Sequence, residues 1–157
     1  MPKPARWLVK TEASTYSWAD LVREGTTAWT GVKNPTAQKN LRLMQKGESV
    51  LVYHTGGEKA VVGLARVARA AYPDPTARGG RNHAVDLEAV RPLARPVTLA
   101  ALRKRPSLAQ WELLRIGRLS VMPVPDAAWD AVMAPAEATE TKAPTASATR
   151  SGSARRR

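Results

Sequence analysis

The sequence predicts an α+β fold in which a small curved sheet or barrel of about five to six strands is flanked by short helices. About five apolar or alternating runs have the length and pattern of β-strands. Short helix-start signals lie between these runs, without the regular strand–helix–strand alternation of a parallel α/β protein. The chain has 157 residues, of which 43% are hydrophobic, so we expect one domain around a single core.

The N-terminal part begins with a strand and a capped helix. Residues 6–10 form a short apolar run that is typical of a buried strand. Ser17, with Asp20 three residues later, is close to a capping box, so a helix is expected to begin here and to end at Gly25. Residues 26–29 then extend the chain briefly before the next helix.

The stretch 29–43 carries the clearest functional signal, which is an aromatic residue and cations at the start of a helix. Asn34 is a suitable N-cap, and Pro35 is a suitable first helical residue. The preceding loop brings Trp29 and Lys33 to the positive end of this helix, where an anion such as phosphate is favoured. An aromatic ring beside such a site is suited to a stacked base.

Further runs along the chain have the pattern of strands. Residues 49–54 and 60–72 flank a Gly-containing turn and predict a hairpin, in which Gly63 indicates a bulge or a bend. Residues 83–92 alternate in polarity, as a half-buried strand does. Residues 118–124 are expected to be extended, because two prolines near the end of this run disfavour a helix.

The C-terminal part is expected to contain short helices and then a tail. Thr98 and Ser107 are placed to cap two short helices, and Asp126 to begin a last turn of helix. We predict one folded domain over residues 1–133. Residues 134–157 lack large apolar side chains and show no periodicity, which predicts a disordered basic tail.

The chain is strongly basic, with a formal net charge of +12. The tail contributes +3 of this charge, so residues 1–133 carry +9. A basic folded domain favours polyanions, and nucleic acid is the partner we expect. Arg-rich composition alone is the alternative explanation. The tail itself could do most of the binding to nucleic acid, or it could serve only to keep the protein soluble.

Composition also argues against several classes of function. The chain has no cysteine and two histidines, which excludes disulfides and thiol catalysis and disfavours a structural zinc site. No apolar run reaches the roughly 20 residues of a membrane span, and the N-terminus lacks the apolar core of a signal peptide. We therefore expect a cytoplasmic protein, monomeric and not bound to a membrane, that uses no metal and no cofactor.

The sequence offers few candidates for catalysis. It contains no Gly-x-Ser-x-Gly elbow and no Gly-rich phosphate loop of the P-loop or dinucleotide type. His54 and His83 are the two imidazoles, and His54 at a strand end suits a structural hydrogen bond at least as well as a general-base role. We expect no catalytic residue and no enzyme. The alternative is an enzyme that acts on RNA or a nucleotide with His54 as general base.

Trp29 and Tyr53 are the aromatic residues that we predict to stack on a base. Trp29 lies in a polar, Gly-containing loop, whereas Trp18, Trp111 and Trp129 fall at core positions of expected helices. Tyr53 lies at the end of a strand that would meet this loop. The alternative is that both rings plug the end of a barrel, since aromatic residues are large contributors to protein cores.

Several runs of the sequence, in this order and at these spacings, resemble one protein family. They are WLVKTE at 7–12, YSWADL at 16–21, WTGVKNPTAQKNLRLMQKGESVLVYHTG at 29–56 and IGRLSVMPV at 116–124. The chain resembles the EVE domains, which are small, thymocyte nuclear protein-like members of the PUA-like superfamily and are related to the YTH domains that read methylated bases. The resemblance extends over residues 5–133.

The resemblance implies a PUA-like barrel that binds nucleic acid and takes a flipped, modified base into a pocket. It implies modified cytosine in DNA as the ligand, with RNA binding or an RNA-modification role as the alternative. The base pocket that it implies comprises Lys10, Thr11, Trp29, Val32, Asn34, Tyr53, His54, Thr55, Leu119 and Ser120. The cations that we expect to hold phosphates are Lys33, Lys39, Arg42 and Arg118.

Overall fold

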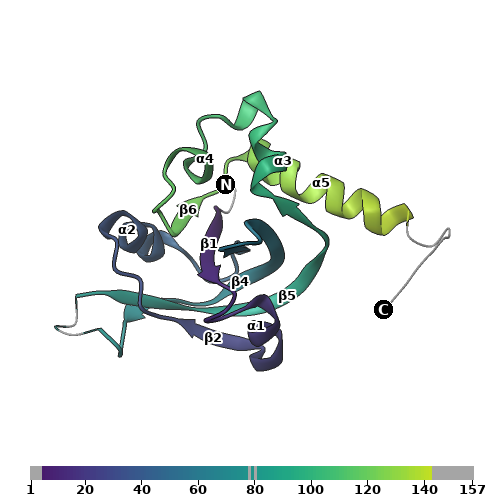
Figure 1. The fold of residues 1–157 in the computed structure, drawn as a ribbon. Helices are drawn as coiled ribbons and strands as arrows, with labels where there is room; N and C mark the ends of the chain where they lie inside the picture. The colour runs from purple at the N-terminus through teal and green to yellow at the C-terminus, as the bar shows by residue number, and fades with distance from the viewer. Residues whose placement is uncertain (1–4, 78, 80, 143–157) are drawn as a thin grey trace.

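The computed structural model describes residues 5–77, 79 and 81–142, which form strands, α-helices and a 3-10 turn (Figure 1). The strands are β1 (Arg6–Glu12), β2 (Thr26–Trp29), β3 (Ser49–Thr55), β4 (Ala60–Pro73), β5 (His83–Thr98) and β6 (Val121–Pro123). The helices are α1 (Trp18–Glu24), α2 (Pro35–Leu43), α3 (Leu99–Arg103), the 3-10 turn η2 (Pro106–Leu108), α4 (Glu112–Arg115) and α5 (Asp126–Lys142).

The strands form one mixed, six-stranded sheet in the order β2-β5-β4-β3-β1-β6. β1 pairs with β3 in parallel, and the other neighbours pair antiparallel. Figure 1 shows β5 curving through the molecule up to α3. The α+β prediction is confirmed. The predicted closed barrel is not confirmed, because the hydrogen-bonded order runs linearly from β2 to β6 within the described residues.

The long β4–β5 ribbon is irregular near Gly63, as the sequence predicts. The β4–β5 register shifts between Val61 and Gly63, and the β3–β4 register shifts at the opposite edge of β4. A Cβ placed on Gly63 would lie 2.5 Å from the ring of Trp18. Glycine is therefore required here, because it allows the first helix to pack its indole directly against the strand backbone.

The helix-start signals act as the sequence predicts at three positions. The Ser17 side chain accepts a hydrogen bond from the Asp20 amide, and the Asp20 carboxylate accepts one from the Ser17 amide, which completes a capping box. The Asn34 side chain caps α2 by accepting from the amide of Ala37. Thr98 caps α3 in the same manner. These local hydrogen bonds fix where the helices around the sheet begin.

The predicted helix from Ser107 is wrong. The segment instead forms η2 and the four-residue α4, and Trp111 between them has an extended backbone. The Trp111 indole is buried and donates a hydrogen bond to the carbonyl of Pro123 at 3.0 Å. This long-range anchor overrides the local helix signal, because burying the indole with its N–H satisfied outweighs a single cap.

The last helix is longer than the sequence predicts. α5 continues to Lys142 instead of stopping at the start of the predicted tail. The helix thus extends into the segment 134–157 that was predicted to be a disordered basic tail, and residues 143–157 lie outside the described part of the chain.

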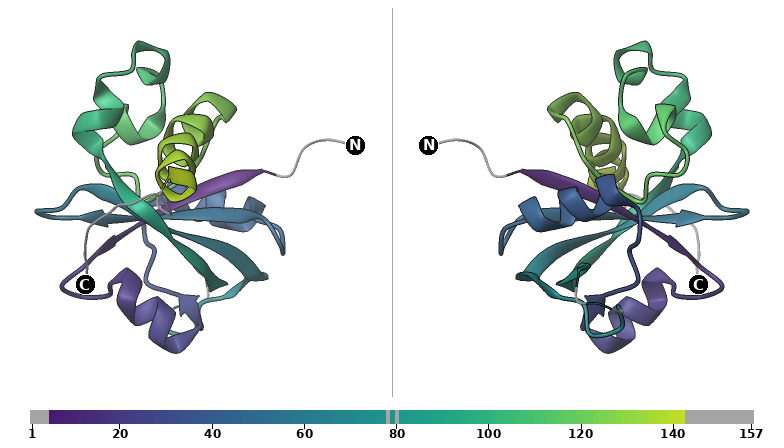
Figure 2. Two further views of the ribbon diagram at one scale, coloured as in Figure 1. Left: turned by 90° about the vertical axis from the view of Figure 1, so that its right-hand side faces the viewer. Right: turned by 90° about the vertical axis from the view of Figure 1, so that its left-hand side faces the viewer.

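Helices lie on both sides of the sheet. Figure 2 shows α3, α4 and α5 on one side and α1 on the other. Trp7, Trp18 and Trp111 are buried in the core. Trp7 donates its indole N–H to the buried carboxylate of Glu48 at 2.8 Å, so the first strand is fixed to the start of β3. This rigid centre positions the loops at the end of β1 and after β2.

Candidate functional site

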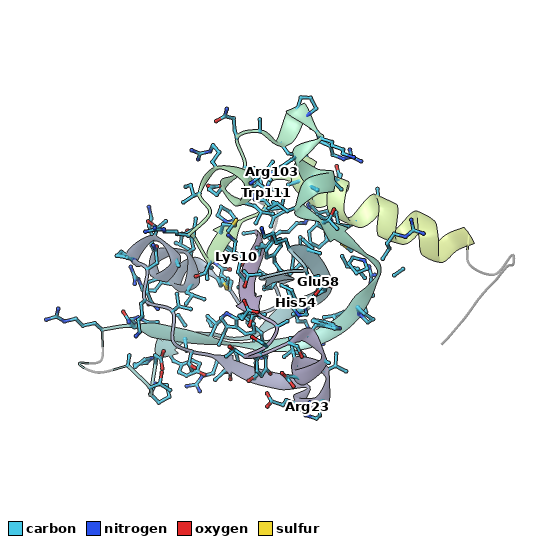
Figure 3. The ribbon with its side chains drawn as sticks, viewed as in Figure 1. Lys10, Arg23, His54, Glu58, Arg103 and Trp111 are labelled. Carbon is cyan, nitrogen blue, oxygen red and sulfur yellow. The ribbon has the colours of Figure 1, made fainter. Side chains whose placement is uncertain are left out.

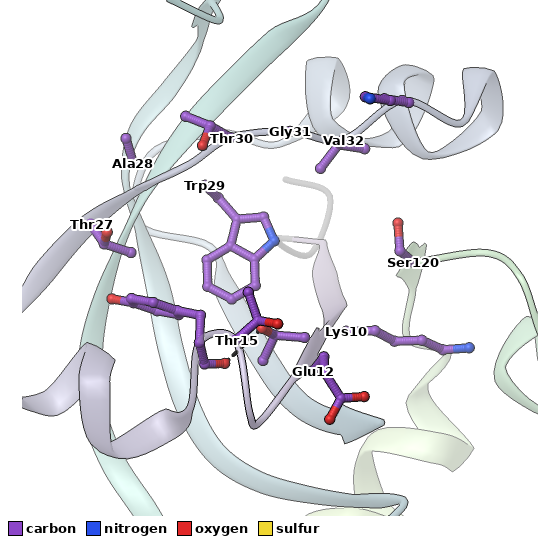
Figure 4. Close-up of a pocket in the computed structure, with 13 residues that line it drawn as sticks. Lys10, Glu12, Thr15, Thr27, Ala28, Trp29, Thr30, Gly31, Val32 and Ser120 are labelled. Atoms are coloured by element: carbon purple, nitrogen blue, oxygen red, sulfur yellow. Dashed lines mark hydrogen bonds between the residues drawn. The ribbon is translucent and has the colours of Figure 1, made fainter. Parts of the chain in front are cut away.

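A cavity of about 620 Å³ lies where β1 ends, beside β2, the loop after β2 and the start of β6 (Figure 4). This volume is typical of a ligand pocket. The structure brings six of the predicted site residues together in its wall, five of them predicted for the base pocket and one for phosphate. They are Lys10, Thr11, Trp29, Val32, Lys33 and Ser120.

The loop that follows β2 is held from two directions. Gly31 has a positive φ of 78°, which glycine adopts without strain, and its N–H donates to the Asp74 carboxylate at 2.9 Å. The carbonyl of Val32 accepts a hydrogen bond from the buried amide of Gln38 at 2.7 Å. The same Gln38 side chain also pairs with the backbone of His83. The cavity wall is therefore preorganised before any ligand binds.

Asp74 is a buried carboxylate that stays charged. Burial favours its neutral form, but hydrogen bonds from the Thr76 hydroxyl and from the amides of Gly31, Thr76 and Ala77 outweigh burial. The pKa of Asp74 is consequently lower than its usual value. Its negative charge fixes the β4–β5 loop to the cavity loop.

Trp29 is the central aromatic residue of the cavity, and its partner is Tyr16. The two ring centroids are 5.9 Å apart with an interplanar angle of 85°, an edge-to-face contact. Tyr16 lines the cavity and donates its hydroxyl to Glu24 at 2.6 Å. Tyr53, the other ring predicted to stack on a base, is buried in β3 and is not part of the cavity wall.

Two lysines bring positive charge to the cavity. Lys10 is half-buried, and its ammonium donates to the carbonyl of Gly117 at 2.9 Å and lies 5.8 Å from the ring centroid of Tyr53. Burial lowers the pKa of Lys10. Lys33 is exposed and also borders a second hollow of about 340 Å³ beside Asp74. Anionic ligands would therefore meet cations on two sides of the cavity.

The other predicted phosphate contacts lie outside the cavity wall. Lys39 and Arg42 are exposed on α2, and Arg118 is exposed on the loop just before Ser120. They remain accessible to a polyanion that extends beyond the cavity.

Three predicted pocket residues have other roles. Asn34 uses its side-chain oxygen as the cap of α2. Leu119 is 2% exposed and belongs to the core, and Tyr53 is also buried. None of the three borders the cavity, so this geometry does not bring them together with the other residues predicted for the base pocket.

His54 is also outside the cavity and has a structural role. Its Nε2 accepts a hydrogen bond from the amide of Trp18 at 2.9 Å, so the ring proton is on Nδ1, which donates to Glu58 at 2.7 Å. Figure 3 shows His54 and Glu58 side by side. Nε2 holds the start of α1 and Nδ1 holds the turn after β3, so neither nitrogen is available to take a proton from a substrate in the cavity.

Thr55 is likewise turned toward β1. Its hydroxyl donates to the Glu12 carboxylate at 3.2 Å and approaches the carbonyl of Thr11 at 3.4 Å. Thr55, which was also predicted for the base pocket, does not line the cavity. The side chains at the end of β3 therefore bond to α1, to the turn after β3 and to β1.

The cavity also contains residues that the sequence prediction missed. They are Glu12, Thr15, Tyr16, Thr27, Ala28, Thr30 and Gly31. Glu12, Thr27, Ala28, Thr30 and Gly31 lie within two residues of predicted positions, so widening each prediction by two residues would have found them. Thr15 and Tyr16 lie in the turn between β1 and α1, which no signal in the sequence indicated.

The described residues narrow the kinds of site that the structure supports. Among them, no group of three or more His, Cys, Asp or Glu side chains could hold a metal ion. In the same part of the chain, none of the helices has the length and apolarity needed to cross a membrane. The cavity combines aromatic and apolar groups with two lysines and the carboxylate of Glu12, a lining that suits a planar ligand with polar edges.

Fold and site together define a small α+β domain with a preorganised, cationic and aromatic cavity. The model of the EVE domain family matches residues 5–134. The chain therefore belongs to the EVE family, which confirms the resemblance found in the sequence. Human thymocyte nuclear protein 1 is 28% identical, over 82% of this chain and 72% of that protein.

Solved structures agree with this assignment. The structure of a protein from Rhodopseudomonas palustris is 42% identical with a TM-score of 0.80, covering 85% of this chain and 94% of that one. Human THYN1, solved in complex with DNA that contains 5-methylcytosine, is 26% identical with a TM-score of 0.77. That comparison covers 85% of this chain and 98% of the human one.

Proposed function

We propose that this chain is a non-catalytic nucleic-acid-binding domain that takes a flipped, modified base, namely modified cytosine in DNA, into the cavity beside Trp29. The observation that carries the proposal is the cavity itself, which combines an indole, the apolar side chain of Val32 and two lysines. The human relative solved with 5-methylcytosine-containing DNA supports this class of ligand.

The residues that line the cavity would each contribute a contact to the flipped base. Flipping a base costs a few kcal/mol of lost stacking and pairing, which contacts inside the pocket must offset. Val32 is 8% exposed and lines the cavity, so it offers an apolar contact to a methyl group on the base, as proteins do for thymine. Ser120 offers a hydroxyl that can donate or accept a hydrogen bond.

The surrounding cations would hold the backbone of the nucleic acid. Lys33 at the mouth of the cavity is the first, and Lys39, Arg42 and Arg118 extend the contact beyond it. Such contacts are independent of sequence and depend strongly on salt. The net charge of +12 favours the same interaction at longer range.

We propose binding without turnover. His54, the residue considered as a general base, has both ring nitrogens engaged by Trp18 and Glu58. The cavity lysines can position an anion but do not form a nucleophile–base pair with a third orienting group. This arrangement supports a reader of bases and gives no support to an enzyme that alters them.

The test is a fluorescence-anisotropy titration of the full chain at two salt concentrations. The ligands are matched DNA and RNA oligonucleotides with one cytosine that is unmodified, methylated or hydroxymethylated. We expect a preference for a modified cytosine in DNA that persists at the higher salt. Equal binding of all ligands, lost together as salt rises, would reduce the protein to a basic surface and overturn the proposal.

Two variants separate the cavity from the surface in the same assay. Trp29→Ala is expected to abolish the preference for the modified base, whereas Arg42→Ala is expected to weaken binding of every oligonucleotide to a similar extent. If both variants lose affinity equally for all ligands, the cavity is not the reading site. A variant truncated after Lys142 tests whether the remaining tail does most of the binding.

A further inference from the structure

The exposure of Trp29 does not suit a stacking platform. Only 8% of the residue is exposed, which for an indole amounts to about 20 Å². The edge-to-face contact with Tyr16 covers part of the ring. A stacked base needs a free aromatic face, and an indole with so little accessible surface cannot offer one.

The indole N–H of Trp29, in contrast, is free. Trp7 and Trp111 donate their indole N–H groups to Glu48 and to the carbonyl of Pro123. Among the described residues, Trp29 Nε1 has no acceptor, and it is also absent from the buried polar atoms that lack a partner. The nitrogen is therefore accessible, and Figure 4 shows it on the side of the ring that faces Ser120 across the cavity.

Ser120 supplies the complementary group. It is half-buried and fixed by its carbonyl, which accepts the Lys10 amide at 2.9 Å. Within the described part of the chain, its hydroxyl has no hydrogen-bond partner, so it can accept or donate. The cavity thus presents an N–H that only donates and, opposite it, a hydroxyl that adapts to the ligand.

We infer that Trp29 reads the edge of the base through its indole N–H, and so selects a cytosine, whose ring nitrogen N3 is an acceptor, over thymine or uracil. In cytosine the acceptor N3 lies beside the amino group on C4, which can donate to Ser120. Thymine and uracil carry N3–H, which would oppose the indole N–H and leave two buried donors unpaired. This inference rests on the proposed function.

The test compares Trp29→Phe with the wild-type full chain. Phenylalanine keeps an aromatic face but removes the N–H. The probes are DNA duplexes with either 5-methylcytosine or thymine opposite an abasic site, so that neither base has a pair to break and both carry the same methyl group. We expect the wild type to favour 5-methylcytosine about tenfold and Trp29→Phe to favour it less than about twofold.

The outcomes separate this inference from the proposed function. If Trp29→Phe keeps the full preference, the indole N–H is not the reader and the inference is overturned while the proposed function stands. If the wild type does not distinguish 5-methylcytosine from unmodified cytosine, in matched duplexes opposite an abasic site, the proposed function fails.

A second measurement uses the wild-type chain alone, in case Trp29→Phe does not fold. The probe contains 3-deaza-5-methylcytosine, in which a C–H replaces N3 and removes the acceptor. We expect its affinity to fall about tenfold relative to 5-methylcytosine. Unchanged affinity would overturn the inference whatever happens to the variant.

Discussion

Val32 in the loop 30–33 and the strand end 53–55 were all predicted for one base pocket, but only the loop borders the cavity. The two segments have similar polarity, but they differ in their place in the sheet. β3 has neighbours on both sides, β4 and β1, so the residues at its end are enclosed and bonded to other elements. β2 is an edge strand, and the loop that follows it is free to border a hollow.

The two segments also use hydrogen bonds differently. At the end of β3 the side chains themselves form the bonds, as when His54 accepts the Trp18 amide. In the loop the backbone is held, by Asp74 at Gly31 and by Gln38 at Val32, and the side chains are left for a ligand. A segment whose backbone is fixed and whose side chains are unpaired is the better candidate for a binding site.

The largest expected effect comes from the strand end and falls on stability. His54→Ala removes a 7% exposed ring and leaves the Trp18 amide without its acceptor. We expect the free energy of unfolding to drop by about 3 kcal/mol, measured by urea titration. The preference of the folded variant for 5-methylcytosine is expected to remain. Glu58→Gln is the matched control, because glutamine still offers His54 an acceptor.

A different result for His54→Ala would contradict the distinction drawn between the strand end 53–55 and the loop 30–33. Normal stability together with a lost preference for the modified base would place the strand end in the site after all.

Asp74→Asn tests the loop, with a smaller effect on stability. The carboxylate accepts from Gly31 through one oxygen and from Thr76 through the other, and asparagine can replace only one of these acceptors. We expect a loss of about 1–2 kcal/mol at pH 7 by urea titration. Because Gly31 is released, the preference for 5-methylcytosine is expected to weaken in the same variant. An unchanged preference would show that the loop keeps its shape without this anchor.

The same substitution has a pH signature. The pKa of Asp74 is lower in the folded chain than the value of about 3.9 expected when it is unfolded. Its charge therefore adds stability above that unfolded value, and the addition is lost as the pH falls through the lower folded pKa. Asp74→Asn should flatten this part of the wild-type curve of stability against pH. A curve that keeps its full steepness at acid pH would assign the effect to other carboxylates.

The sequence predicted well where the signal is local. The caps at Ser17, Asn34 and Thr98 were found because a cap needs only a few adjacent residues. The helix expected after Ser107 failed, since the buried indole of Trp111 decides that segment from a distance. Whether the sheet closes into a barrel could not be predicted from the hydrophobic pattern, because strand order is set by contacts between distant segments.

The site followed the same rule. Trp29 and Val32 were expected to lie together and do line one cavity, because the loop lies directly before a recognisable helix start. Tyr16 was missed because its contact with Trp29 depends on the turn that joins β1 to α1. The structural role of His54 stayed one of two interpretations of the sequence, because the strand pattern does not show which neighbour bonds a polar side chain.

Lys33→Ala probes the charge of the loop and should have a modest effect. Lys33 borders the cavity and the second hollow beside Asp74. We therefore expect its loss to weaken the binding of every oligonucleotide at low salt. The slope of log affinity against log salt should fall by about one, as for one phosphate contact. Lys39→Ala is the matched control on α2. A loss confined to modified cytosine would mean that Lys33 touches the base and not the backbone.

Tyr53→Phe should have the smallest effect and is the most direct check of the comparison. Tyr53 is 3% exposed and does not border the cavity, and burial raises the pKa of its phenol. Phenylalanine keeps the ring beneath the Lys10 ammonium, which lies 5.8 Å from its centroid. We therefore expect stability within about 0.5 kcal/mol of wild type and an unchanged ratio of affinities for 5-methylcytosine and thymine. A drop in that ratio as large as the one expected for Trp29→Phe would bring the Tyr53 hydroxyl into the site, and the strand end and the loop would then share the reading of the base.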